Sequence, residues 1–479
     1  MFRKVCNDRP HIEISRPVNG TALRAKKSGV TTAVVVACAL ALLPSVSGPL
    51  FAQEALLASV NPNEAADSNS TIAPEQSVDL PADLNPPLPV ATDTADESAV
   101  PISRVDSGIP RRFHYELRLN VHSVYDDNIN ISNGVRTADF FTAIEPTIML
   151  GFGDFESGQG NFIRLNYLAS WFLFADHSEN DALQHVLQLQ GQYQMNRLTL
   201  SLTQSVQILD GTDVRSLNSG GTFDQQVNLD VAGRTRFDLY ATHFNAAYYL
   251  TGKTSVSAGV DYSASNYSSL ISSEVLSGNL FVNYNYSPKL VVGLGGTAGT
   301  DRVDAPNPDQ TFEQANVRVT YQATGKIDLS ASAGVEFRHF EGDLVDEHIS
   351  PVFEIGLNYL PFDGTQISLT ANRRVLNSAV LSGQDFAITN INLAVQQRLL
   401  QRFFAGLNVG YENSDYFSTV GTTGPDRNDN YFFVQPSISV RVTRFWTVGG
   451  YYLHRANDSS FGVFSFHDNQ FGLRSSLTF

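Results

Sequence analysis

The stretch Tyr321–Phe337, "YQATGKIDLSASAGVEF", decides the fold. Its second half alternates without a break. Apolar residues occupy one parity and mainly polar residues the other: Ile327, Leu329, Ala331, Ala333, Val335 and Phe337 against Asp328, Ser330, Ser332 and Glu336. Successive side chains of a strand point to opposite faces, so this pattern predicts a strand with one apolar and one polar face. The turn before it is only Thr324-Gly325-Lys326, which is short enough for a hairpin.

The same succession of strand, short turn and strand recurs along the chain. Variants are "YYLTGKTSVSAGVDY" from Tyr248, "VNYNYSPKLVVGLGG" from Val282 and "LNYLPFDGTQISLTANR" from Leu357. The short turns often carry a basic residue: Arg197, Lys253, Lys289, Lys326, Arg402 and Arg444. The opposite strand ends meet longer polar links, such as "DRVDAPNPDQ" from Asp301. Short and long connections are therefore expected to alternate strictly.

Eighteen strands follow from these patterns and turn signals. We expect them at residues 113–124, 138–152, 161–175, 183–195, 197–209, 235–250, 254–266, 275–286, 289–300, 311–322, 326–338, 349–360, 365–375, 385–398, 403–413, 430–442, 445–456 and 467–479. No helical segment is available to cover a sheet face. In a bilayer the apolar parity can face lipid, and closing the sheet satisfies every backbone group. The predicted fold is an all-β, transmembrane antiparallel barrel of about 18 strands, with a disordered N-terminal arm.

Aromatic residues support this prediction, because girdles of them flank the lipid-facing band of such barrels. We assign the following to lipid-facing parity: Tyr167, Trp171, Tyr249, Tyr262, Tyr284, Tyr286, Tyr321, Phe337, Tyr359, Tyr411 and Tyr451. The chain ends in "HDNQFGLRSSLTF", and this alternating strand with terminal Phe479 resembles an outer-membrane assembly signal. The barrel assembly machinery and outer-membrane lipid are therefore expected partners.

The first 112 residues differ from the rest in amino-acid composition. Residues 1–52 combine a basic start, an apolar run and a small-residue exit, which is typical of a secretory signal peptide. Residues 53–112 hold ten acidic and three basic residues and no aromatic, so we expect a disordered acidic periplasmic linker. It is either a passive spacer or a segment that binds a periplasmic partner. The barrel domain is expected at 113–479.

Charge and cysteine content exclude several functions. Residues 1–52 hold seven of the 32 basic and two of the 48 acidic residues, so their removal leaves 25 and 46, a formal charge of -21. Such a chain is not suited to binding nucleic acid. Both cysteines, Cys6 and Cys38, lie in that segment, so the mature chain has no thiolate for a zinc site. The mean hydropathy of -0.13 excludes a polytopic helical membrane protein.

The polar parity predicts the lining of a lumen. It carries neutral amides and hydroxyls, such as Gln188, Gln190 and Gln192, then Ser201 and Thr203. Charged residues join them along the expected substrate path: Arg118, Arg164, Arg318, Arg338, Arg374, Arg398, Arg441, Arg474, Glu116, Glu336 and Glu354. Eighteen strands make a barrel too wide to be filled by its own side chains, so we expect water inside. Any single arginine either meets solute or braces the wall through an ion pair.

The phrase "SVYDDNINIS" follows the first predicted strand and includes Tyr125-Asp126-Asp127-Asn128. With the meander from 113 to 479, it resembles the β-barrel porin families of Gram-negative outer membranes, of the type associated with exopolysaccharide export. This resemblance implies passage of a hydrophilic solute or polysaccharide across the outer membrane. It does not explain the acidic linker.

The link Asp210–Arg234 is similar to the loop of general porins that folds inward after the fifth strand and narrows the pore. On that similarity, Asp213, Arg215 and Asp224 would be its selectivity charges. A surface loop and an extra hairpin are the alternatives.

We expect no enzyme activity, no catalytic residue, no cofactor and no metal. Histidines stand near acids at His122, His339, His348 and His454, but ten histidines among polar loops produce such neighbours by chance. Asp126, Asp127 and Asn128 could bind calcium, yet they lack a spaced loop with a closing glutamate. Two functions remain open: a channel for hydrophilic solutes, with an exopolysaccharide as one candidate, and a non-conducting barrel whose loops act as adhesin or receptor.

Overall fold

The computed structural model describes residues 113–153, 160–213, 227–231, 233–323, 325–342, 347–421 and 427–479. The predicted signal peptide and acidic linker lie outside these ranges. Within them, no helix has both the length and the apolar character to cross a membrane.

Eighteen strands and two short 3-10 turns make up the described chain. The strands are Phe113–Asp126 (β1), Asp139–Gly153 (β2), Phe162–Phe174 (β3), Ala182–Gln194 (β4), Leu198–Gly211 (β5), Thr235–Tyr249 (β6), Thr254–Tyr267 (β7), Ser273–Ser287 (β8), Leu290–Val303 (β9), Gln310–Ala323 (β10), Ile327–Phe340 (β11), His348–Tyr359 (β12), Thr365–Asn377 (β13), Gln384–Leu399 (β14), Phe403–Ser418 (β15), Asn428–Arg441 (β16), Trp446–Ser459 (β17) and Phe466–Thr478 (β18). The 3-10 turns are Ser178–Asn180 (η1) and Gly462–Phe464 (η2).

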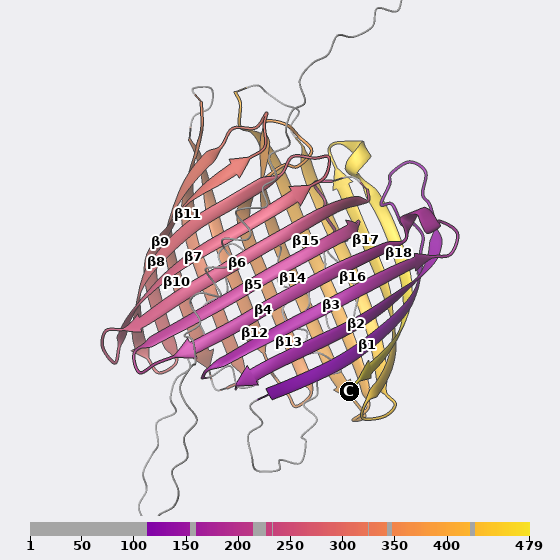
Figure 1. The fold of residues 1–479 in the computed structure, drawn as a ribbon, viewed down its shortest axis with the longest axis horizontal. Coiled ribbons are helices and arrows are strands. Elements are labelled where there is room, and N and C mark those ends of the chain that lie inside the picture. Colours follow the sequence, from indigo (N-terminus) through magenta and orange to yellow (C-terminus); the bar gives the residue numbers. More distant parts are fainter. Residues whose placement is uncertain are drawn as a thin grey trace, which may run out of the picture. The chain divides into compact units, whose positions relative to one another are not determined.

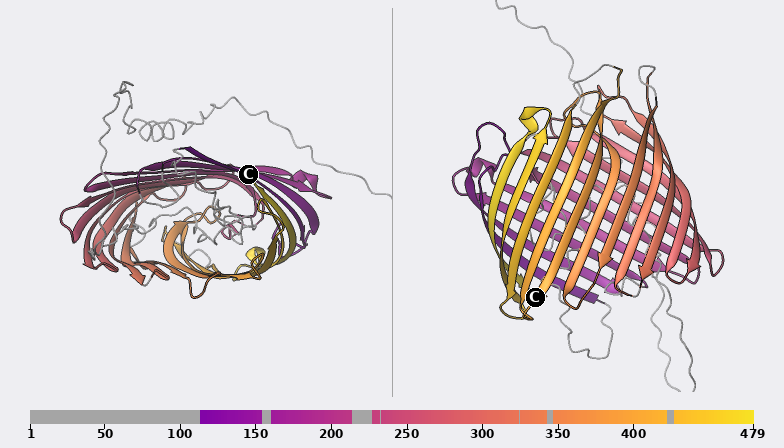
Figure 2. Two further views of the ribbon diagram at one scale, coloured as in Figure 1. Left: turned by 90° about the horizontal axis from the view of Figure 1, so that it is seen from below. Right: turned by 180° about the vertical axis from the view of Figure 1, so that it is seen from behind.

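The strands form one closed antiparallel barrel (Figure 1). Each strand pairs with its neighbours in the chain, and β1 also pairs with β18, from Arg118 opposite Thr478 to Asp126 opposite Gln470. Closure leaves no free sheet edge, as a membrane-spanning sheet requires. The barrel is a flattened ring when it is seen along its axis (Figure 2, left). The predicted fold class is confirmed.

The predicted strands agree with the structure closely. All eighteen are present, and their bounds differ by at most three residues except at the end of β15, which continues to Ser418. Several strands continue beyond their predicted ends toward the long links. The strict alternation of connection lengths is wrong in one place, since the link between β2 and β3, 154–161, is longer than the next link, 175–181, between β3 and β4.

The exterior of the barrel carries an apolar belt. On β11, Ala333 and Val335 point outward and are exposed, whereas Ser332 and Glu336 are buried on the inner face. Large exposed side chains such as Leu280 and Leu294 continue the belt on β8 and β9. A closed sheet with such a surface satisfies its backbone groups internally and offers its apolar side to lipid. The chain is a protein of the outer membrane.

Two of the predicted lipid-facing aromatics point the other way. Tyr451 is 8% exposed and shares the inward parity of Leu453, and Tyr249 shares the parity of buried Ala247. Both belong to tyrosine doublets, and the outer face of β6 takes Tyr248, which is 44% exposed. A doublet places one tyrosine on each face, so alternation alone does not say which one meets lipid.

The barrel has a short-turn end and a long-link end, here named for the connections that they carry (Figure 1). The basic turn residues lie at the short-turn end and join adjacent hairpins through their carbonyl groups. The carbonyl of Lys253 accepts from the Asn285 amide at 2.8 Å, and that of Lys289 accepts from the Gln322 amide at 2.9 Å. The C-terminal Phe479 is bonded there to Leu117 of β1 at 2.8 Å, which completes the seam.

Apolar side chains fill part of the interior toward the long-link end. One cluster joins inward-facing residues of β1–β3 and β16–β18: Val124, Phe141, Ala143, Phe172, Phe174, Tyr431, Phe433, Tyr451, Leu453 and Phe466. A second joins Leu168, Val186, Leu209, Phe237 and Leu239. At this end the barrel is therefore partly filled by its own side chains, because the inward parity becomes apolar there.

Candidate functional site in the barrel lumen

The inner face of β4 and β5 carries a partly exposed polar surface. Gln188, Gln190 and Gln192 on β4, with Ser201 and Thr203 on β5, remain partly exposed on their inward parity. Inward positions on the other walls vary: Gln314, Arg318 and Glu354 are partly exposed, whereas Asn316, Ser350, Ser368, Asn390, Gln435 and Ser439 are buried. The amide and hydroxyl wall predicted from the sequence is therefore confirmed as an inner, partly open surface.

A short piece of the link between β5 and β6 lies inside the barrel. We call Val227–Val231 the inner segment. Val227 and Leu229 belong to the apolar cluster formed by inward residues such as Phe141 and Phe433. Aliphatic side chains packed against the inner faces of distant strands place this piece within the lumen. The packing of Val227 and Leu229 is what an inward-folded link would require, and folding of the whole link remains a prediction.

Asp230 fixes the inner segment to the link between β13 and β14 and to β15. Its Oδ1 accepts from the Ser378 hydroxyl at 2.8 Å and from the Tyr416 hydroxyl at 3.0 Å. Its Oδ2 accepts from the Ala379 amide at 2.5 Å. Burial raises the pKa of Asp230, and the bond from Ser378, the charge of Arg427 and the remaining hydrogen bonds oppose that shift.

Arg427 holds the same segment from the other side. It is fully buried, and its guanidinium donates to the Leu229 carbonyl at 2.6 Å and the Asp230 carbonyl at 3.2 Å. It also donates to Asp429 Oδ2 at 2.6 Å and lies 4.4 Å from the centre of the Tyr416 ring. Because planar guanidinium groups bond in fixed directions, Arg427 sets both the position and the orientation of the segment.

The start of the link between β5 and β6 is fixed to β17. Asp213 and Val227 form an antiparallel bridge, and Asp213 Oδ1 accepts from Arg455 Nη1 of β17 at 2.7 Å. Asp213 was predicted as a selectivity charge, and in the structure it anchors the link through an ion pair. Arg215 and Asp224, the other two predicted constriction charges, lie outside the described residues.

The predicted lumen arginines fall into groups by the partners that they meet. Arg338 on β11 is 3% exposed and braces the wall, since it pairs with Glu336 at 2.8 Å and with Asp301 at 3.1 Å. It also donates to Gln310 at 2.8 Å. Arg338 and Glu336 are therefore parts of a buried network and are not free to meet a solute.

Arg318 on β10 is different, because its bonded partners are neutral. Its Nε donates to Asn283 Oδ1 at 2.8 Å, and its Nη2 donates to the Ser257 hydroxyl at 2.7 Å. The guanidinium lies 4.1 Å from the centre of the Phe281 ring. Among the residues that the structure describes, no carboxylate forms an ion pair with it. Arg318 thus keeps its charge available to the lumen.

Several predicted arginines gather toward the short-turn end. Arg118 pairs with Glu116 on the same strand at 2.7 Å, and Arg164 donates to Gln190 of the amide wall at 2.5 Å. Arg398 and Arg441 lie close enough for their charges to repel. This end of the lumen is therefore rich in positive charge.

A cavity of about 180 Å³ lies beside the inner segment. Asp230 borders it on one side, and Glu354, Arg374 and Glu412 border it on the other. The predicted path residues Arg374 and Glu354 therefore do come together. Arg474 on β18 is buried opposite His122 of β1 and lies apart from this group.

The sequence Asp126-Asp127-Asn128 links β1 to β18 through hydrogen bonds. Asn128 donates to the carbonyls of Ser132 and His467, each at 2.9 Å. Asp127 accepts from the amide and the side chain of Asn469, at 2.8 and 2.7 Å. The phrase that carries the sequence resemblance thus closes the barrel seam at the long-link end.

Two of the histidines that stand near acids in the sequence, His122 and His454, contact other residues in the structure. His122 pairs with Glu145 of β2 at 3.1 Å, although Asp126 and Asp127 are nearer in the sequence. His454 contacts Asn469 at 2.9 Å. These histidines brace adjacent strands.

Sequence reasoning missed Asp230, Ser378, Tyr416, Arg427 and Arg455. They lie on links or late strands, and the contacts of Asp230 with Ser378 and Tyr416 span 148 and 186 residues. The one local signal is the apolar alternation of Val227, Leu229 and Val231 inside a polar link, which is typical of a buried segment.

No family model matches the chain, and no curated protein matches it. Similar solved structures include the outer membrane protein OpdK of Pseudomonas aeruginosa, at 10% identity and a TM-score of 0.42, covering 76% of this chain and 99% of that one. Another is OccAB4 of Acinetobacter baumannii, at 9% identity and a TM-score of 0.38, with coverage of 76% and 98%. A third is OccK2 (OpdF) of P. aeruginosa in complex with glucuronate, at 10% identity and a TM-score of 0.39, with coverage of 76% and 98%.

Proposed function

We propose that the chain is an outer-membrane channel for hydrophilic solutes and that the inner segment narrows it. The observation that carries this proposal is the partly open amide and hydroxyl face of β4 and β5 inside a closed barrel. In barrels of this class the short turns face the periplasm and the longer loops face outward. The narrowing then lies toward the outer side.

The lining favours solutes that carry hydroxyl groups. Glutamine, serine and threonine side chains replace the hydrogen bonds that a sugar loses with water, at little net free-energy cost. The finer proposal is that the solute is an exopolysaccharide on its way out of the cell. It is supported by this lining and by the resemblance of the Tyr125–Asn128 phrase.

The charge distribution favours anionic solutes at the short-turn end. Arg398 and Arg441 lie there, and Arg318 further along the lumen has neutral bonded partners. Exposed basic turn residues, among them Lys253 and Lys289, surround the entrance. A ring of positive charge raises the local concentration of anions and lowers their entry barrier.

A second function is favoured by a specific observation. The apolar clusters at the long-link end occupy interior volume that an open pore would leave to water. A barrel closed in this way would display its outer loops as adhesin or receptor without conducting. Two further proposals do not depend on whether the barrel conducts. The first is that the acidic residues 53–112 bind a periplasmic partner or the barrel entrance. The second is that the barrel assembly machinery recognises β18.

Single-channel conductance in a planar bilayer tests the channel proposal. Residues 53–479 and residues 113–479 are compared at equal salt. Steady steps in both forms support an open channel, and steps only in the shorter form support closure by the acidic arm. Silence in both forms, from protein shown to be folded, contradicts the channel and favours the loop-displaying barrel. Block of the current by acidic oligosaccharides, and not by neutral ones of equal size, supports the finer proposal.

A further inference from the structure

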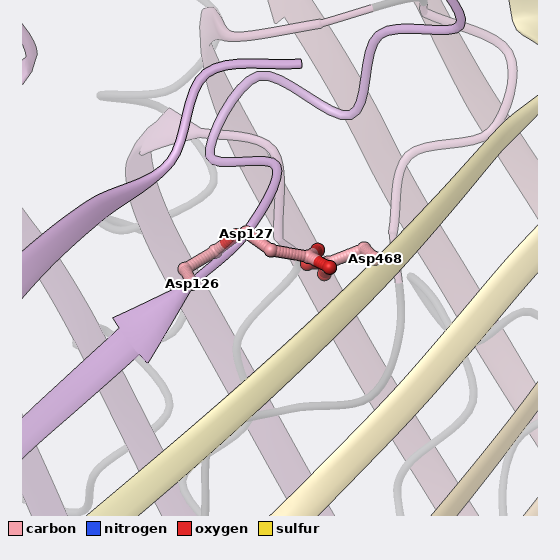
Figure 3. Close-up of side chains that lie close together, drawn as sticks. All are labelled: Asp126, Asp127 and Asp468. Carbon is pink, nitrogen blue, oxygen red and sulfur yellow. The ribbon is translucent and has the colours of Figure 1, made fainter.

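Three aspartates meet where the barrel seam reaches the long-link end. Asp126 ends β1, Asp127 follows it, and Asp468 lies near the start of β18 (Figure 3). One carboxylate oxygen from each lies within 4.8 Å of the others. The strand register explains the meeting, because Asp126 is opposite Gln470, and Asp468 is one pleat further along on the same inner face.

Two of these carboxylates are buried from solvent. Asp126 is 4% exposed and Asp468 is 0% exposed. Oδ1 of Asp468 is buried and has no N–H or O–H donor among the described residues, and the Asp126 and Asp468 carboxyl groups lie within hydrogen-bonding reach of each other. An unpaired buried carboxylate oxygen costs free energy unless a proton or a cation meets it. The cluster therefore has a coordinating atom without an assigned partner.

The surrounding cations do not balance the charge. Arg455 is shared, since its Nη1 pairs with Asp213 and its Nε with Asp468. In the described chain, the bonded donors of Asp126 are the Asn128 amide at 2.7 Å and the Gln470 side chain at 3.0 Å, both neutral. Those of Asp127 are two groups of Asn469, which are neutral as well.

The other nearby guanidinium is already shared. Arg234 lies near Asp213, Asp210 and Asp126 at once, so its charge is shared among three carboxylates. Arg234 therefore balances no single carboxylate, and net negative charge remains at the seam.

We propose that Asp126, Asp127 and Asp468 bind a calcium ion. Oxygen donors without nitrogen or sulfur are typical of hard divalent cations, and calcium accepts irregular sets of carboxylates completed by water. The sequence alone predicts no metal here, because Asp126, Asp127 and Asn128 lack a spaced loop with a closing glutamate. Asp468 lies more than 300 residues from the other two aspartates, so only the closed barrel completes the site.

The ion would stabilise the seam between β1 and β18. It would tie the end of β1 to β18, and through Arg455 it would stabilise the ion pair with Asp213 at the root of the link that carries the inner segment. This inference does not rest on the proposed transport function, because the binding of calcium is measured without transport.

Calorimetric titration of calcium into the full chain, purified in detergent and stripped with a chelator, tests the proposal. We expect one calcium ion per chain, with an affinity in the range of extracellular sites, about 10⁻⁴–10⁻³ M. Asp468→Asn should weaken binding by roughly 10-fold or more, as the loss of a group that supports a metal does. Asp458→Asn changes an exposed aspartate at the end of β17 and should bind as the wild type does.

A second variant guards against a folding defect, because Asp468 also pairs with Arg455. Asp127→Asn keeps that pair and should show the same loss of affinity in a barrel that still migrates as folded protein. Two results would overturn the proposal: no saturable binding by the wild type, or equal binding by the wild type and Asp127→Asn. In either case the carboxylates share a proton instead.

Discussion

The Tyr416 hydroxyl donates a hydrogen bond of 3.0 Å to Asp230 Oδ1, although 186 residues separate them in the chain. Tyr416 belongs to β15 and Asp230 to the inner segment, so this bond fixes the link between β5 and β6 to a distant wall. The Ser378 hydroxyl shares the same acceptor oxygen at 2.8 Å. Because Asp230 is the acceptor of these bonds while Val227 and Leu229 pack in an apolar cluster, the hydrogen bonds fix the inner segment in a single position.

Replacing Asp230 with alanine should release the inner segment. The variant loses the bonds from Ser378, Ala379 and Tyr416, and each buried donor left unpaired costs about 1–3 kcal/mol. We expect larger single-channel steps with more open-channel noise than in the wild type. Glu341→Ala changes an exposed acidic residue of the link between β11 and β12 and should leave the steps unchanged. Identical traces from Asp230→Ala and the wild type would show that the segment does not limit the current.

Docking of the inner segment should depend on pH with a defined sign. Burial raises the pKa of Asp230, so the docked carboxyl holds its proton more tightly than a released one. Protonation therefore favours docking as the pH falls through this raised pKa, and the gain is complete below the ordinary value of 3.8. Other ionisable groups lie around it: Arg427, Tyr416, Tyr267 and Asp429. The pKa of Asp230 is raised overall even though the positive charge of Arg427 lowers it.

Open-channel noise checks this sign. Noise caused by release of the segment should decrease as the pH falls through the raised pKa of Asp230 toward its ordinary value of 3.8. Asp230→Asn has no proton to gain and should lose that dependence, even though other lumen groups still titrate. An equal pH dependence in the variant would assign the effect to those other groups.

Local alternation predicted the strands because each strand can be assigned from its own residues. Ile327 to Phe337 alternate over a whole strand, and the structure places that strand as expected. Alternation failed at Tyr249 and Tyr451, where doublets place a tyrosine on both faces. It also identified which arginines point inward. It could not separate Arg338 from Arg318, because only the register shows which carboxylates stand beside each one.

Arg318 should set part of the ion selectivity of the channel. Its bonded partners are Asn283 and Ser257, so its charge is not cancelled by a carboxylate of the described chain. Arg318→Gln keeps a hydrogen-bonding side chain and removes the charge. We expect the reversal potential in a salt gradient to shift toward cation preference. Arg302→Gln is the matched control, because Arg302 pairs with Glu274 on the exposed exterior. A reversal potential shared by Arg318→Gln and the wild type would exclude Arg318 from the ion path.

Arg338 should govern stability where Arg318 governs selectivity. Arg338 is buried among Glu336, Asp301 and Asp385, and removing its charge leaves three carboxylates without their shared cation. Breaking a buried ion pair by removing one partner costs about 3–5 kcal/mol, whereas an exposed pair is worth about 0–1 kcal/mol. Arg338→Gln should therefore unfold at a lower urea concentration in lipid vesicles, and Arg302→Gln should match the wild type. Equal midpoints for the two variants would mean that the carboxylates take up protons and that the network adds little to the stability of the barrel.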